Sequence, residues 1–148
     1  MTAVVRPTSW DLPLFLHVAG AMTLVGTVLA TLVLAFAGVR RPDARVLANG
    51  AFLCLLAALP AWAVLRVGAT WTYSKEVAAY PGHSDPGWIS IGYAAADAGL
   101  LILLVAVGVA YAWSRQLRPW APRALSAVGT LYLALLAVAW LAMTGKWG

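Results

Sequence analysis

Three residues that can carry charge or bind a ligand interrupt long apolar stretches of this sequence. His17, Arg66 and Asp97 each lie among mostly aliphatic neighbours. Ionisable groups inside a bilayer are costly, and they usually mark a binding site, an ion or proton path, or a structural pair. We therefore treat the three residues as a candidate cluster for an ion, a proton or a small ligand.

The positions of these residues along their stretches favour such a cluster. At 1.5 Å per helical residue, Asp97 lies about 13 Å below Trp88, and Arg66 lies roughly a turn and a half below Trp71. An Arg66–Asp97 ion pair is therefore geometrically feasible, with His17 near enough to join it. The alternative is structural. Arg66 then reaches the membrane interface, Asp97 accepts from a hydroxyl or backbone donor, and His17 bonds to another helix.

Cofactor and metal sites have little support in the sequence. His17 is a conceivable haem ligand, but haem in a four-helix bundle normally has two axial ligands from facing helices. The other histidine, His83, lies outside the apolar stretches, which leaves Met22 and Met143 as soft partners. Cys54 is the only cysteine, so no zinc spacing exists. We predict no cofactor and no metal, with haem at His17 as the alternative.

Catalytic patterns are also missing from the sequence. It contains no nucleophile–base pair, no glycine-rich phosphate loop and no paired carboxylates. We therefore do not predict an enzyme.

The elements that would position these residues are membrane-spanning helices. Hydrophobic residues make up 63% of the 148 positions and charged residues 10%, against roughly 25% charged in a soluble domain. Four apolar stretches are long enough to cross ~30 Å of hydrocarbon, which takes about 20 helical residues. We predict an all-α polytopic membrane protein, a single domain over residues 1–148 that forms a four-transmembrane-helix bundle in the lipid bilayer. The helices are predicted at about 12–39, 46–69, 88–113 and 122–144.

The longest connection, at about 70–87, is the one with room for structure of its own. Pro81-Gly82 and Asp85-Pro86-Gly87 are typical turn sequences. We expect this segment to fold over the outer mouth of the bundle. Its candidate binding residues are Trp71, Tyr73, His83 and Asp85.

Basic residues indicate the orientation of the chain. Six of its ten lysines and arginines lie in or beside the connections at 40–45 and 115–123. The positive-inside rule predicts that these loops are cytoplasmic and that both termini lie outside. The net charge of +5 is thereby explained, and no nucleic-acid partner is predicted. The alanine- and arginine-rich, lysine-poor composition favours a bacterial plasma membrane.

The eight tryptophans fall into two groups. Six, Trp113 among them, lie near predicted helix ends, where an indole can bury its ring and keep its N–H hydrated. Trp62 and Trp140 lie deeper, and we expect them to pack between helices.

Both ends of the apolar region carry a family resemblance. Leu16-His17-Val18-Ala19-Gly20-Ala21, followed by Val25-Gly26, is similar to the Leu-His-Val-x-Gly opening of a family of small bacterial integral membrane proteins of unknown function. That family is distantly similar to the membrane region of copper-resistance protein D. The closing segment Trp140–Lys146 resembles the family's ending on Trp and Met followed by Thr-Lys. The resemblance implies a four-helix membrane fold and no reaction, and it places His17 on the motif histidine.

Three functions remain open at the level of sequence. The leading interpretation is a membrane subunit with an accessory, assembly or small-ligand-binding role, whose partner is another membrane protein or a second copy of the chain. The second is a haem- or metal-linked redox protein that uses His17. The third is a small transporter or channel subunit, in which Arg66 or Asp97 lines a wet path between associated copies.

Overall fold

The computed structural model describes residues 8–79 and 87–145, which form four long helices after a 3-10 turn at Thr8–Trp10. No strand occurs in these two ranges. Each of the four is long and apolar enough to cross a membrane. The chain is therefore an all-α, multi-pass integral membrane protein, as the sequence predicted. The helices are α1 (Asp11–Arg40), α2 (Arg45–Ala79), α3 (Gly87–Gln116) and α4 (Ala121–Gly145).

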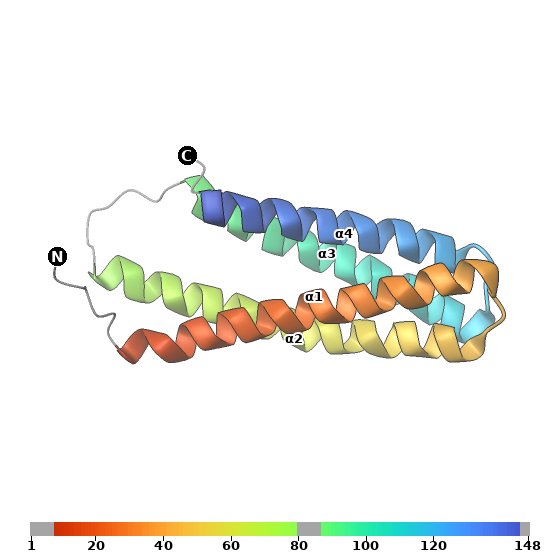
Figure 1. The fold of residues 1–148 in the computed structure, drawn as a ribbon. Helices are drawn as coiled ribbons and strands as arrows, with labels where there is room; N and C mark the ends of the chain where they lie inside the picture. Colours follow the sequence, from red (N-terminus) through yellow and green to blue (C-terminus); the bar gives the residue numbers. More distant parts are fainter. Residues whose placement is uncertain (1–7, 80–86, 146–148) are drawn as a thin grey trace.

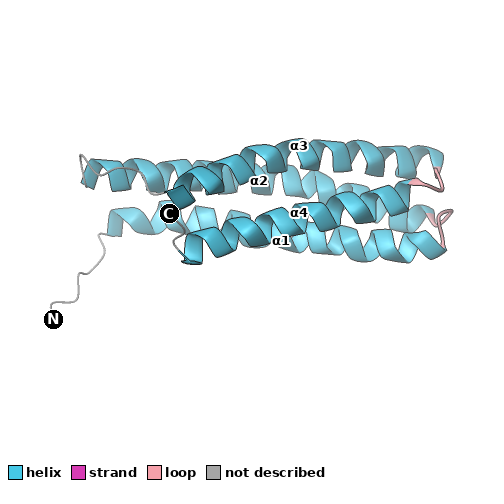
Figure 2. Ribbon diagram, turned by 90° about the horizontal axis from the view of Figure 1, so that it is seen from above, coloured by secondary structure: helices cyan, strands magenta, loops and turns pink. Residues whose placement is uncertain are grey.

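The helices form two antiparallel hairpins, α1 with α2 and α3 with α4 (Figure 1). A second view at right angles shows all four helices running along one common direction (Figure 2). The short connections at 41–44 and 117–120 lie at one end, where the hairpins are close together. The hairpins diverge toward the other end. We call the first the arginine end and the second the open end.

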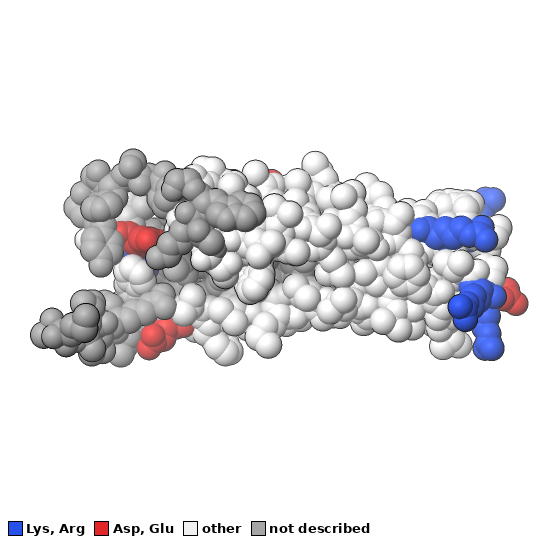
Figure 3. All heavy atoms as spheres, turned by 45° about the horizontal axis from the view of Figure 1, so that its top comes forward, with Lys and Arg blue, Asp and Glu red and all other residues white. Residues whose placement is uncertain are grey.

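Basic side chains gather at the arginine end, with an acidic side chain beside them, and acidic side chains are also seen toward the open end (Figure 3). The surface between them is mainly uncharged in this view. Charge therefore concentrates beyond the apolar part of the bundle, as expected of a protein that spans a bilayer. The arginines of the arginine end are Arg40, Arg41, Arg45, Arg115, Arg118 and Arg123.

Trp113 joins the two hairpins at the arginine end. Its side chain is fully buried, and its Nε1–H donates to the carbonyl of Pro42 at 2.9 Å. Its ring fills the space beside Gly38, where a Cβ would collide with it. The prediction that this indole keeps its N–H hydrated was wrong. The Pro42 carbonyl, left free between two helices, satisfies the N–H in place of water.

Close packing between helices rests on glycines. A Cβ added at Gly20 would meet the backbone of Leu65, and one added at Gly68 would meet the backbone of His17. Gly20 and Gly68 therefore let the backbones of α1 and α2 touch, as small residues do in membrane bundles. In the second hairpin, Gly99 of α3 faces the ring of Tyr132 on α4.

The second helix is longer than predicted. We expected it to end at about residue 69 and to be followed by a loop over 70–87, but α2 continues to Ala79. Residues 70–79 contain no glycine or proline, and the hydroxyl of Thr72 bonds back to the carbonyl of Gly68 at 2.8 Å. Nothing in this segment breaks the helix, and Trp71 and Tyr73 belong to α2. His83 and Asp85 lie outside the described residues.

Candidate functional site

A cavity of about 710 Å³ lies between all four helices in the half of the bundle toward the open end. Aliphatic and aromatic side chains form most of its wall, with Val18 and Met22 from α1 and Ile89 from α3 among them. Small-molecule sites typically occupy about 300–1,000 Å³ and are mostly apolar with a few placed polar groups. The wall also carries polar side chains, which are His17, Arg66, Thr72, Tyr73, Glu76 and Tyr93.

His17 is held by a backbone contact across the α1–α2 interface. Its Nδ1 lies 3.3 Å from the carbonyl oxygen of Leu65. Since a carbonyl only accepts hydrogen bonds, Nδ1 carries the proton in this contact, and Nε2 of the neutral ring is an acceptor. The structure therefore supports the interpretation of His17 as an interhelical hydrogen-bonder. His17 also contributes to the cavity wall.

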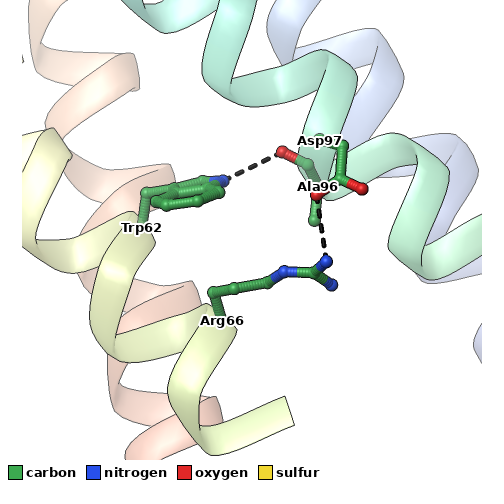
Figure 4. A network of polar contacts seen from close by, with 4 residues as sticks. All are labelled: Trp62, Arg66, Ala96 and Asp97. Carbon is green, nitrogen blue, oxygen red and sulfur yellow. Dashed lines mark hydrogen bonds and ion pairs between the residues drawn. The ribbon is translucent and has the colours of Figure 1, made fainter. Parts of the chain in front are cut away.

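Arg66 and Asp97 form the ion pair that their spacing suggested. Nη2 of Arg66 lies 3.0 Å from Oδ1 of Asp97 (Figure 4). The guanidinium carbon also lies 4.3 Å from the ring centroid of Tyr93, a cation–π geometry. Arg66 is thus held against α3 by both a carboxylate and an aromatic face.

Trp62 ties the same two helices together one turn below Arg66. Its Nε1–H donates to the carbonyl of Ala96 at 2.9 Å (Figure 4). The expectation that Trp62 packs between helices is confirmed. The same expectation for Trp140 was wrong, because 62% of that residue is exposed. Its side chain contributes to the wall of the cavity.

The three predicted residues do not form one cluster. His17 and Arg66 both line the cavity, whereas Asp97 is not among the lining residues and 64% of its side chain is exposed. The structure records no bond from His17 to either charged residue within the described ranges. Arg66 therefore connects two surfaces, the cavity wall and the outer face of α2 and α3.

Three polar residues of the site were missed in the sequence, Thr72, Glu76 and Tyr93. Tyr93 lies four residues before Asp97, so helical periodicity alone places it one turn away on the same face. Glu76 was missed because we expected a loop there. On a continuous helix, Arg66, Tyr73 and Glu76 follow one another at intervals that keep them on one side.

Metal binding has few candidate ligands in this cavity. Within residues 8–79 and 87–145, no group of three or more His, Cys, Asp or Glu side chains is placed to hold a metal ion. Nε2 of His17 is one available nitrogen ligand, and Met22 and Met143 bring thioethers to the same wall. Such a set would suit a haem iron with one histidine and one methionine better than zinc.

Comparison with known proteins found no matching protein-family model, no matching curated protein and no matching solved structure. The family resemblance of the first helix and of the chain's end therefore stays a prediction.

Proposed function

We propose that this protein is a non-enzymatic membrane subunit that binds a small amphipathic molecule in the cavity between its four helices. The observation that carries the proposal is the cavity itself, about 710 Å³ in volume and walled mainly by apolar side chains. A packed bundle leaves few voids larger than a water molecule. A space of this size, reached by polar groups on one side, suits an apolar body with a small polar head.

The polar side of the wall indicates what the head of the ligand should be. Arg66 offers N–H donors, but its charge is already balanced by Asp97. A neutral group that accepts hydrogen bonds, such as a carbonyl, therefore fits better than a carboxylate, which would bring a second negative charge. The body of the molecule would lie against residues such as Val18, Ile89 and Met143.

Filling the cavity should remove the ligand. A Cβ at Gly92 would have the Met143 sulfur, at 3.9 Å, as its nearest neighbour, so Gly92→Leu projects into the cavity without meeting backbone. Gly26 on α1 is exposed and has nothing within 4 Å of such a Cβ, which makes Gly26→Leu the matched control. Organic extracts of the purified proteins, read by mass spectrometry, should contain a small molecule with wild type and the control but not with Gly92→Leu. The same extract from all three would reject the proposal.

A second candidate function, a haem-binding redox protein, is favoured by the acceptor Nε2 of His17 and by Met143 in the same wall. The absorption spectrum of the purified protein decides between the two candidates. A haem band that His17→Ala abolishes would replace the first proposal with this one. A colourless protein that retains a small molecule would eliminate the haem.

The proposal also covers the membrane in which the protein lies and the side of that membrane to which each end of the bundle points. We place the chain in a bacterial plasma membrane with the arginine end in the cytoplasm, so that the cavity opens toward the outside. Six arginines at one end of the bundle support this orientation. The composition supports the bacterial assignment.

A further inference from the structure

Asp97 is an exposed carboxylate at a depth where lipid tails would surround the bundle. The part of α4 between Arg123 and Thr144 has no charged residue, and its length of roughly 30 Å equals the hydrocarbon thickness. On α3, Gly92 lies near Met143 and Gly99 lies against Tyr132, both within this part of α4. Asp97 falls between these two glycines and is therefore level with the hydrocarbon.

The ion pair with Arg66 satisfies Asp97 only in part. A carboxylate has about four lone-pair sites, and a guanidinium has five N–H donors. Within the described ranges Arg66 is the one basic residue paired with Asp97, yet 64% of the Asp97 side chain stays exposed. Lipid tails supply neither donors nor acceptors, so polar groups in spans almost always face protein or water. Something other than lipid should cover this face.

We propose that a second copy of this chain covers it, in a two-fold dimer through the outer face of α2 and α3. Two copies inserted in the same direction can be related only by an axis along the membrane normal, which preserves depth. Such an axis places α3 of one copy opposite α2 of the other. Asp97 then meets the second copy's Arg66 at the same level, and two ion pairs close into a ring of four alternating charges.

Charge complementarity favours a second copy of the chain over a different membrane protein as the partner of this face. The face carries one positive and one negative group side by side, 3.0 Å apart, so it is complementary to itself after a two-fold rotation. The larger side chains of Val67 and Leu101 are exposed beside the pair. Small residues are exposed there as well, which permits the close approach that helices need in membranes. They are Ala63 and Thr70 on α2 and Ser90 and Ala94 on α3.

Cysteine cross-linking between two differently tagged copies tests this arrangement. Both carry Cys54→Ala, and one carries Thr70→Cys while the other carries Ala94→Cys. Each copy then has a single cysteine, so no disulfide can form within a copy. Co-expression followed by mild oxidation should give a disulfide-linked pair that carries both tags. Phe15→Cys replaces Thr70→Cys in the control, since Phe15 is exposed in the first turns of α1 at the open end.

The yield of the cross-linked pair should depend on the charge of Asp97 as well as on the distance between the two cysteines. Asp97→Asn in both copies should raise the dimer dissociation constant about tenfold, the effect of two polar contacts of average strength between membrane helices, and should lower cross-linking accordingly. Three results would overturn the proposal. One is equal cross-linking in the Phe15→Cys control, another is the absence of the mixed disulfide, and the third is a disulfide formed by Ala94→Cys with a different membrane protein.

Discussion

Arg66 and Asp97 are accommodated within a membrane span because each lies against the other and because the ring of Tyr93 covers the guanidinium. Removing one partner of such a pair leaves an uncompensated charge in a poorly solvating environment. Removing both with apolar side chains leaves no charge to solvate. The two residues should therefore behave as a unit.

This coupling is testable by a double-mutant cycle. Arg66→Leu and Asp97→Leu should each lower the free energy of unfolding by about 2–4 kcal/mol, whereas the double variant should lose about 1 kcal/mol or less. Reversible unfolding in mixed detergent micelles measures all four proteins. If the loss in the double variant equals the sum of the single losses, the two side chains are independent and the coupling is disproved.

Helical periodicity predicts part of the site from the sequence. The rest depends on contacts between the backbones of different helices, which the sequence does not reveal. Ala95, Gly99 and Leu103 are buried at intervals of four residues, and Asp97 is rotated by about 200° from Ala95. The outward direction of Asp97 could therefore have been predicted. The partner of His17 could not, because the carbonyl of Leu65 lies 48 residues away and depends on how α1 crosses α2.

At the scale of the element, the crossing of α1 and α2 determines where the site residues stand. Gly20 and Gly68 bring the two backbones into contact on either side of the His17–Leu65 bond. A side chain at either position would separate the helices. The polar wall of the cavity therefore depends on two glycines that take no part in it.

A single methyl group tests this dependence. Gly20→Ala places a Cβ 2.5 Å from the backbone nitrogen of Leu65, and such overpacking should cost about 1–3 kcal/mol. Gly26→Ala, in open space on the same helix, should stabilise the protein by a few tenths of a kcal/mol to about 1 kcal/mol because alanine favours helix. Thermal unfolding in one detergent compares the two. Equal stability of the variants would contradict the close approach.

Most helix ends were predicted within three residues because charged or turn-forming residues follow the apolar stretches there. The first helix was expected to end at about residue 39 and ends at Arg40, and the last was expected to begin at about 122 and begins at Ala121. The end of α2 was missed by ten residues. Hydropathy falls after Ala69 because polar and charged residues appear, but a helix can continue past the hydrocarbon into water.

At the scale of the whole molecule, the two ends have different roles. The buried Trp113 and its bond to Pro42 hold the hairpins together at the arginine end. Toward the open end the hairpins diverge (Figure 1), and the cavity occupies the half of the bundle nearest to it. A bundle joined at one end can present a binding space at the other without losing its fold.

The orientation of these ends can be measured in intact cells. In a Cys54→Ala background, Ala79→Cys at the open end should react with a membrane-impermeant maleimide from outside. Gln116→Cys at the arginine end should react only after the cells are opened. Both side chains are exposed, so accessibility to the reagent depends on the side of the membrane. The reverse pattern would contradict the positive-inside assignment.

Native mass spectrometry of the intact protein measures whether a ligand occupies the four-helix cavity. Wild type and Gly26→Leu, released from lipid nanodiscs, should each retain one small molecule per chain. Gly92→Leu should fold as wild type does and should be detected at the mass of the chain without a ligand. A wild-type chain without a bound molecule, or a bound molecule of the same mass in Gly92→Leu, would show that the cavity does not hold a ligand.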